Sequence, residues 1–148
     1  MCTGLSVLFI HGIMHRTETL ILASGSAIRA TLLAQAEVPF TVQVAQIDEE
    51  LVRTSLQAQH LSARDIADAL AELKAQRVSN KNPDELVLGC DQILDFAGLI
   101  LAKPANQSDL KIQLQQLRGG EHRLHTAAVI FQSGRPIWRS VQTVTLHM

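Results

Sequence analysis

Short apolar runs alternate with helical patterns along the first half of the chain. Leu20–Ala23 is apolar, and small residues at 24–26 separate it from a stretch in which apolar side chains recur every four positions as far as Ala36. This order predicts a strand, a tight turn and a helix, which Pro39 ends. Apolar residues then alternate over Phe40–Ile47, which predicts a second strand.

A helix and a buried strand are predicted in the middle of the chain. Ser62 precedes Asp65 by three positions, a spacing typical of a helix start. The apolar stripe expected for this helix is Ile66, Leu70 and Leu73. The continuous apolar run Leu86–Cys90 predicts a strand covered on both faces.

The last third of the chain predicts a helix and a hairpin. Ser108 is expected to cap the helix, and its expected inward-facing residues are Leu110, Leu114 and Leu117. Residues 123–131 and 137–146 predict two antiparallel strands around a Ser-Gly turn. Because strands alternate with helices along the whole chain, the predicted fold class is α/β.

The two ends of the chain depart from this pattern. We expect residues 1–18, which precede the first firm strand, to form an N-terminal arm outside a domain that spans residues 19–148. The last predicted strand runs to Met148 with no turn or helix after it. Because an unpaired terminal strand is a liability in a finished domain, we expect the fold to be incomplete at its C-terminus.

Composition narrows the possible functions. The 148 residues are 47% hydrophobic and 18% charged, which excludes a disordered chain. The formal net charge of −1 and the 3% aromatic content argue against a nucleic-acid partner. Leu5–Ile13 is too short to span a bilayer, so no membrane partner is expected. Two cysteines cannot form a disulfide framework, and this usage is typical of the cytoplasm.

The segment 24–29 carries groups suited to a phosphate. Ser24 and Ser26 supply hydroxyl groups, and a helix start leaves main-chain N–H groups that attract anions. Arg29 follows one helical turn later and can fold back onto the same anion. The alternative interpretation is an ordinary serine-capped helix.

Three carboxylates follow the predicted strands. Asp48 and Glu49 come after the second strand, and Asp91 comes after the third. Ligands of open α/β sheets bind outside the carboxyl ends of strands, and clustered carboxylates hold Mg²⁺ while leaving room for phosphates. Partial burial would raise the pKa of Asp91 toward that of a general base. The alternative interpretation is three solvated loop acids.

Two lysines complete the candidate set. Lys74 borders the apolar stripe of its predicted helix instead of lying opposite it. Lys103 precedes Pro104, which restricts it to extended geometry. With Arg29, these lysines provide three cations that can face one anion, although each of them alone is typical of a solvated surface.

A series of strings resembles, in the same order, the motifs of the Maf family of nucleotide pyrophosphatases, once described as septum-formation proteins. LILASGSAIR resembles the opening of the family pattern, QIDEE its acidic loop and DIADALAELKAQRV its lysine-bearing helix. VLGCDQIL resembles its Gly-x-Asp strand end, GLILAKPAN its Gly-Lys-Pro segment and LRGGEHRLHTAAVI its Gly-x-x-His strand. The resemblance runs from about Thr19 to the end of the chain.

The resemblance implies an elongated mixed β-sheet flanked by helices, a Maf/inosine-triphosphatase-like fold. It also implies hydrolysis of a nucleoside triphosphate at its α-phosphate, which yields a monophosphate and pyrophosphate, with Mg²⁺ or Mn²⁺ as cofactor and with a homodimer possible. The implied substrate-binding residues are Ser24, Ser26, Arg29, Lys74, Gln92 and Lys103. The implied metal ligands are Asp48, Glu49 and Asp91, and Asp91 is also the implied base that activates water.

The chain departs from the family pattern at two places. Family members usually read Ser-Pro-Arg-Arg where this chain has Ser26-Ala27-Ile28-Arg29, so one phosphate-binding arginine is missing. A Gly-rich segment with a base-selecting glutamine has no counterpart in this sequence. The alternatives are therefore an impaired nucleotide-binding or regulatory module linked to cell division, or an inactive fragment. Gln92 resembles the branch that acts on 7-methyl-GTP, where the branch that acts on dTTP and UTP has Thr, and both substrate classes stay open.

Overall fold

Six strands form one mixed sheet in the computed structural model, which describes residues 19–148. The arm expected at residues 1–18 lies outside the described residues. The strands are β1 (Leu20–Leu22), β2 (Phe40–Val42), β3 (Leu86–Phe96), β4 (Leu99–Leu101), β5 (Glu121–Gln132) and β6 (Arg135–His147). Their order is β2-β1-β3-β5-β6, with β4 paired to β3. The pairs β1–β2 and β1–β3 are parallel, and the other pairs are antiparallel.

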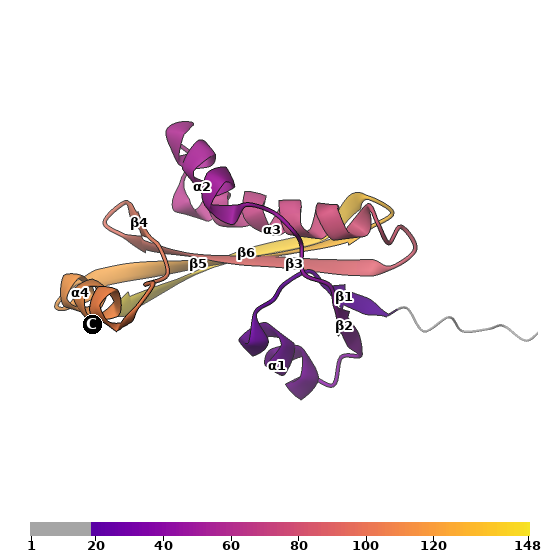
Figure 1. The fold of residues 1–148 in the computed structure, drawn as a ribbon, viewed down its shortest axis with the longest axis horizontal. Helices are drawn as coiled ribbons and strands as arrows, with labels where there is room; N and C mark the ends of the chain where they lie inside the picture. The colour runs from indigo at the N-terminus through magenta and orange to yellow at the C-terminus, as the bar shows by residue number, and fades with distance from the viewer. Residues whose placement is uncertain (1–18) are drawn as a thin grey trace, which may run out of the picture.

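Four helices flank this sheet. They are α1 (Ala27–Gln35), α2 (Glu49–Ala58), α3 (Ala63–Ser79) and α4 (Gln107–Leu117). Figure 1 shows α2 and α3 on one side of the sheet, α1 on the other side and α4 at the far end of the long β5–β6 hairpin. The predicted α/β class, with an elongated mixed sheet flanked by helices, is confirmed. Within the described residues, no helix is both long enough and apolar enough to cross a bilayer.

The core lies between α3 and the central strands. Ile66, Leu70 and Val78 of α3 are buried against Val87 of β3 and Val129 of β5. The approach of α3 to β3 is close, because a Cβ atom added at Gly89 would lie 2.1 Å from the Ala71 carbonyl oxygen. A glycine inside a strand often marks such a close approach. Position 89 therefore sets how near α3 lies to the sheet.

The start of α3 confirms the sequence prediction, but its buried stripe differs from it. The Ser62 hydroxyl accepts a hydrogen bond from the Asp65 main-chain N–H at 3.1 Å. Ile66 and Leu70 are buried as expected, whereas Leu73 is half-buried and Lys74 is buried in its place. Carboxylate partners under the helix stabilise the lysine in this buried position.

The ends of two strands differ from the prediction, and one helix, α2, was not predicted. β2 ends at Val42 because its neighbour β1 ends at the paired residue Leu22. Residues 49–58 form α2, for which Asp48 accepts the capping hydrogen bond from the Leu51 N–H. β3 continues to Phe96 because β5 pairs with it through Asp95. Asp91 therefore lies in the middle of a strand instead of following one.

The prediction for α4 was wrong in its cap and in its buried face. The cap is Asn106, whose side chain accepts from the Asp109 N–H, because the helix begins at Gln107, before Ser108. Leu117 is buried, but Leu110 and Leu114 are 41% and 42% exposed. Within the described residues, too little of the molecule packs on α4 to cover its apolar face.

Candidate active site

A gap in strand pairing positions the candidate site. β5 pairs with one edge of β3 from Val87 to Asp95. On the other edge, β1 pairs with residues 86–88 and β4 pairs with residues 94–96, so no described strand covers residues 89–93. We call this segment the open edge of β3. Asp91 lies at its centre. The turn at residues 24–26, which follows β1, lies on one side of the open edge. The connection that carries Lys103, which follows β4, lies on the other side.

A buried lysine lies between two carboxylates at this edge. The Nζ atom of Lys74 is 2.6 Å from Asp91 Oδ1 and 2.9 Å from Glu49 Oε2. Lys74 is 5% exposed and Asp91 is 6% exposed, whereas the side chain of Glu49 is more than half exposed. Each residue comes from a different element, namely α3, β3 and the first turn of α2. The structure thus brings three of the predicted site residues together at this edge.

The turn after β1 is connected to β3 through hydrogen bonds of Arg29. Arg29 Nη1 donates to Ser24 Oγ at 2.9 Å and to the main-chain oxygen of Cys90 at 3.0 Å. Cys90 directly precedes Asp91, so one guanidinium group links the turn to the centre of the open edge. Ser26 is the N-cap residue of α1, but its side chain makes no capping hydrogen bond. The main-chain N–H groups at the start of α1 are therefore available to donate hydrogen bonds to a phosphate oxygen.

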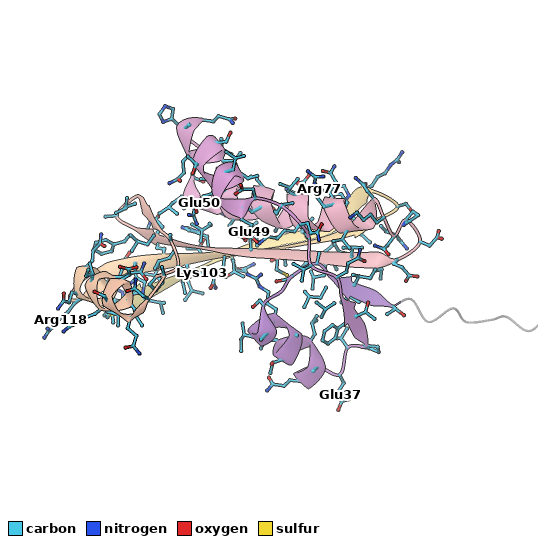
Figure 2. The ribbon with its side chains drawn as sticks, viewed as in Figure 1. Glu37, Glu49, Glu50, Arg77, Lys103 and Arg118 are labelled. Carbon is cyan, nitrogen blue, oxygen red and sulfur yellow. The ribbon has the colours of Figure 1, made fainter. Side chains whose placement is uncertain are left out.

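The remaining predicted residues, Asp48, Lys103 and Gln92, lie outside the cluster formed by Lys74, Asp91 and Glu49. Asp48 is exposed and caps α2, so its carboxylate oxygen is engaged by the Leu51 N–H at 3.0 Å. Figure 2 shows Lys103 on the connection between β4 and α4, where it is exposed and forms no hydrogen bond or ion pair with the described residues. Gln92 points to the face of the sheet opposite Asp91, because successive strand residues alternate in direction.

The burial of Asp91 changes its acidity. Desolvation raises the pKa of the Asp91 carboxyl above its ordinary value, and the negative charge of Glu49 adds to this effect. The charge and the hydrogen bond of Lys74, together with the charge of Arg29, act in the opposite direction. The net direction is upward, which is the direction required of a carboxylate that accepts a proton from water.

The carboxylates fit a metal ion only in part. Among residues 19–148, no group of three or more His, Cys, Asp or Glu side chains is arranged to hold a metal. The expected set of Asp48, Glu49 and Asp91 does not form, since Asp48 serves as a helix cap. Glu49 and Asp91 share one lysine, however, and Mg²⁺ is commonly bound by one or two carboxylates together with substrate phosphates. These two residues fit that mode of binding.

The sequence motifs agree with a comparison to known families. The family model described as "Maf-like protein" matches residues 19–148. The chain belongs to the Maf family. The site on the open edge of β3 is therefore the candidate active site of a Maf-like chain.

Curated relatives of this Maf-like chain carry related names. It is 53% identical over 132 residues to the nucleoside triphosphate pyrophosphatase of Ruegeria pomeroyi, covering 89% of this chain and 66% of the relative. It is 39% identical over 132 residues to the 7-methyl-GTP pyrophosphatase of Brucella abortus, with the same coverage of both chains. The chain thus spans just under two thirds of the length of these relatives. A solved HAM1 protein from Coxiella burnetii is similar with a TM-score of 0.49 at 11% identity, covering 86% of this chain and 70% of that one.

Two contributors to the site were not predicted from the residues. The Cys90 carbonyl oxygen anchors Arg29, and no side-chain pattern signals a main-chain acceptor. Gly89 allows α3 to approach β3, which brings Lys74 within reach of Asp91. A glycine inside an apolar strand run was a signal that could have indicated this approach.

Proposed function

We propose that this chain carries the active site of a nucleoside triphosphate pyrophosphatase. The reaction is hydrolysis of a nucleoside triphosphate to a nucleoside monophosphate and pyrophosphate. The observation that carries the proposal is Lys74, buried between Asp91 and Glu49 beside the Ser24–Arg29 turn. A buried cation, an acidic pair and an uncapped helix start suit a polyphosphate, whose cleavage depends mainly on positioning and charge neutralisation.

Each residue has a proposed role. Ser24, Ser26 and Arg29 bind phosphate oxygens at the start of α1. Lys74 neutralises the triphosphate from α3, and Lys103 does so from the β4–α4 connection. Gln92, on the opposite face, contacts the nucleoside.

Asp91 acts as the general base. Its carboxylate accepts a proton from water, and the water oxygen forms a bond to the α-phosphorus. The bond from that phosphorus to the α–β bridging oxygen breaks, and pyrophosphate leaves with the electron pair. Lys74 keeps Asp91 ionised before the attack, since the lysine charge lowers the pKa that burial raises.

A divalent cation, Mg²⁺ or Mn²⁺, belongs to this proposal. Glu49 and Asp91 would hold it together with phosphate oxygens, and it would neutralise charge on the triphosphate. Asp48 supports this arrangement indirectly, because its capping bond fixes the first turn of α2, from which Glu49 extends.

The test measures pyrophosphate released from GTP, 7-methyl-GTP, UTP and dTTP, with Mg²⁺, with Mn²⁺ and with chelator. We expect release that depends on the cation and falls about 10²–10⁴-fold in Asp91→Asn. Asp84→Asn is the matched control, because Asp84 is exposed in the turn before β3. Lys103→Ala is expected to lower turnover, whereas Lys111→Ala, on the exposed face of α4, leaves it unchanged.

Two outcomes would contradict the proposal. Equal rates for Asp91→Asn and the parent would remove the assigned base. Nucleotide-dependent thermal stabilisation without any turnover would favour the nucleotide-binding module instead.

The proposal also covers the cellular location and the oligomeric state of the enzyme. We place it in the cytoplasm, where nucleoside triphosphates are found and where the buried Cys90 thiol stays reduced. We also expect a homodimer, which sedimentation equilibrium of the purified chain would detect as twice the monomer mass.

A further inference from the structure

Gln92 belongs to a polar row on the face of the sheet that α3 does not cover. It is paired with Thr126 of β5, which is paired with Gln142 of β6. Paired residues on neighbouring strands point to the same face. Gln92 is exposed and Trp138 of the same face is 50% exposed, so among residues 19–148 this face is open to a ligand.

The row adjoins the proposed phosphate site. The Cys90 carbonyl oxygen points to the open edge of β3, where Arg29 contacts it. Main-chain groups two positions apart point to the same edge of a strand, so those of Gln92 face the open edge as well. Figure 1 shows α1, which begins at the phosphate-binding turn, on this same side of the sheet. A nucleoside whose phosphates bind Ser24 and Arg29 can therefore reach Gln92.

One hydrogen bond fixes the orientation of the Gln92 carboxamide. Its Nε2 donates to Thr126 Oγ1 at 2.8 Å. The carboxamide oxygen forms no hydrogen bond with the described residues, so it is available as an acceptor. A held acceptor favours a base edge with adjacent N–H donors, as in guanine, over the uracil edge, in which one N–H lies between two carbonyl oxygens.

We propose that Thr126 is a positioning residue for nucleobase recognition, because it holds the Gln92 carboxamide with its oxygen toward the base. This inference rests on the proposed function, since it assumes that the ligand is a nucleotide. Thr126 contacts neither the phosphates nor Asp91 in this account. Its loss should therefore change base selectivity and leave the chemical step intact.

The test compares Thr126→Val with Thr126→Ser in the full chain. Calorimetry gives the Kd values of the α,β-methylene analogues of GTP and UTP. In Thr126→Val, the preference for the GTP analogue should fall about three- to tenfold, the change expected from one lost hydrogen bond. Thr126→Ser keeps the hydroxyl and should keep the preference. With hydrolysed substrates, Thr126→Val should raise KM for GTP with kcat unchanged.

A double variant separates positioning from a direct or merely structural effect. Gln92→Ala with Thr126→Val should show the same selectivity as Gln92→Ala alone, because both changes remove one interaction. Additive losses, an unchanged preference in Thr126→Val, or a serine variant that behaves like the valine variant would overturn the inference while the proposed function stands. Absence of both nucleotide binding and pyrophosphate release in the parent would overturn both.

Discussion

The two faces of β3 differ in almost every property that matters for chemistry. On the face toward α3, Val87, Gly89 and Asp91 are buried, and Asp91 pairs with a buried lysine. On the opposite face, Gln92 is exposed and hydrogen-bonds a hydroxyl group. The comparison teaches that the charged groups depend on the docking of α3, whereas the polar row on the other face depends on strand pairing alone. Substitutions on the covered face should therefore affect stability and catalysis together.

The largest expected effect is that of Lys74→Met. The change leaves Asp91 buried without its cation and should lower the free energy of unfolding by about 3–5 kcal/mol at neutral pH. Chemical denaturation measures this loss, and Lys111→Met on the exposed face of α4 is the control. The deficit should shrink at acidic pH, because Asp91 then becomes neutral. A deficit as small as that of Lys111→Met would show that the two faces do not differ as described.

Gly89→Ala should cost about 1–3 kcal/mol or more, because its Cβ atom would collide with the backbone of α3. Since displacement of α3 also moves Lys74 away from Asp91, activity should fall in the molecules that still fold. Gly25→Ala is the control for stability, because its Cβ atom would meet only the Val44 side chain, at 3.4 Å. Equal unfolding midpoints for the two variants would contradict the close approach of α3.

The pH dependence of turnover tests the electrostatics of the covered face. Because the folded-state pKa of Asp91 is raised, its ionised form is lost at a higher pH than for an exposed aspartate. The acid limb of kcat should lie correspondingly high. Glu49→Gln removes a charge that raises this pKa, so the limb should move to lower pH. Glu121→Gln, an exposed change on β5, should not move it, and a shift to higher pH in Glu49→Gln would contradict the account.

The same raised pKa has a consequence for stability. The folded protein binds the Asp91 proton more tightly than the unfolded chain does. The Asp91 contribution is therefore destabilising at pH values above the folded-state pKa, and it disappears as the pH falls below the unfolded-state value. Relative to Asp91→Asn, the parent should gain free energy of unfolding as the pH is lowered through this window.

The smallest expected effects are those of substituting the serines near the starts of α3 and α4. Ser62→Ala should cost about 1 kcal/mol, because it removes the acceptor of the Asp65 N–H. Ser108→Ala should cost less, since Asn106 is the cap of α4. Thermal unfolding of both variants would distinguish the structural cap from the cap predicted by sequence, and equal losses would contradict the observed helix start.

Local patterns were sufficient for much of the fold. The strand–turn–helix at 20–35 and the capped start of α3 follow from residue spacing, and the structure confirms them. The end of β3 and the exposure of Leu110 could not be predicted this way. Pairing with β5 decides the first, and the absence of a packed neighbour among the described residues decides the second.

In the candidate site, too, some features could be predicted from local patterns and others depend on tertiary packing. Lys74 stood out because it borders an apolar stripe, and Asp91 stood out because it follows an apolar run. That both meet Glu49 required tertiary information, since α2 itself was not predicted. Asp48 and Glu49 are adjacent in sequence, yet one caps a helix and the other pairs with Lys74, a difference that only the local backbone geometry determines.

Hydrolysis in ¹⁸O-labelled water tests the central claim most directly. If water activated by Asp91 attacks the α-phosphorus, the label should appear in the nucleoside monophosphate and the pyrophosphate should stay unlabelled. Asp91→Asn should suppress the labelled product in proportion to its lost turnover. Label in pyrophosphate or in orthophosphate, or labelling of the monophosphate at the parent rate in Asp91→Asn, would contradict the account.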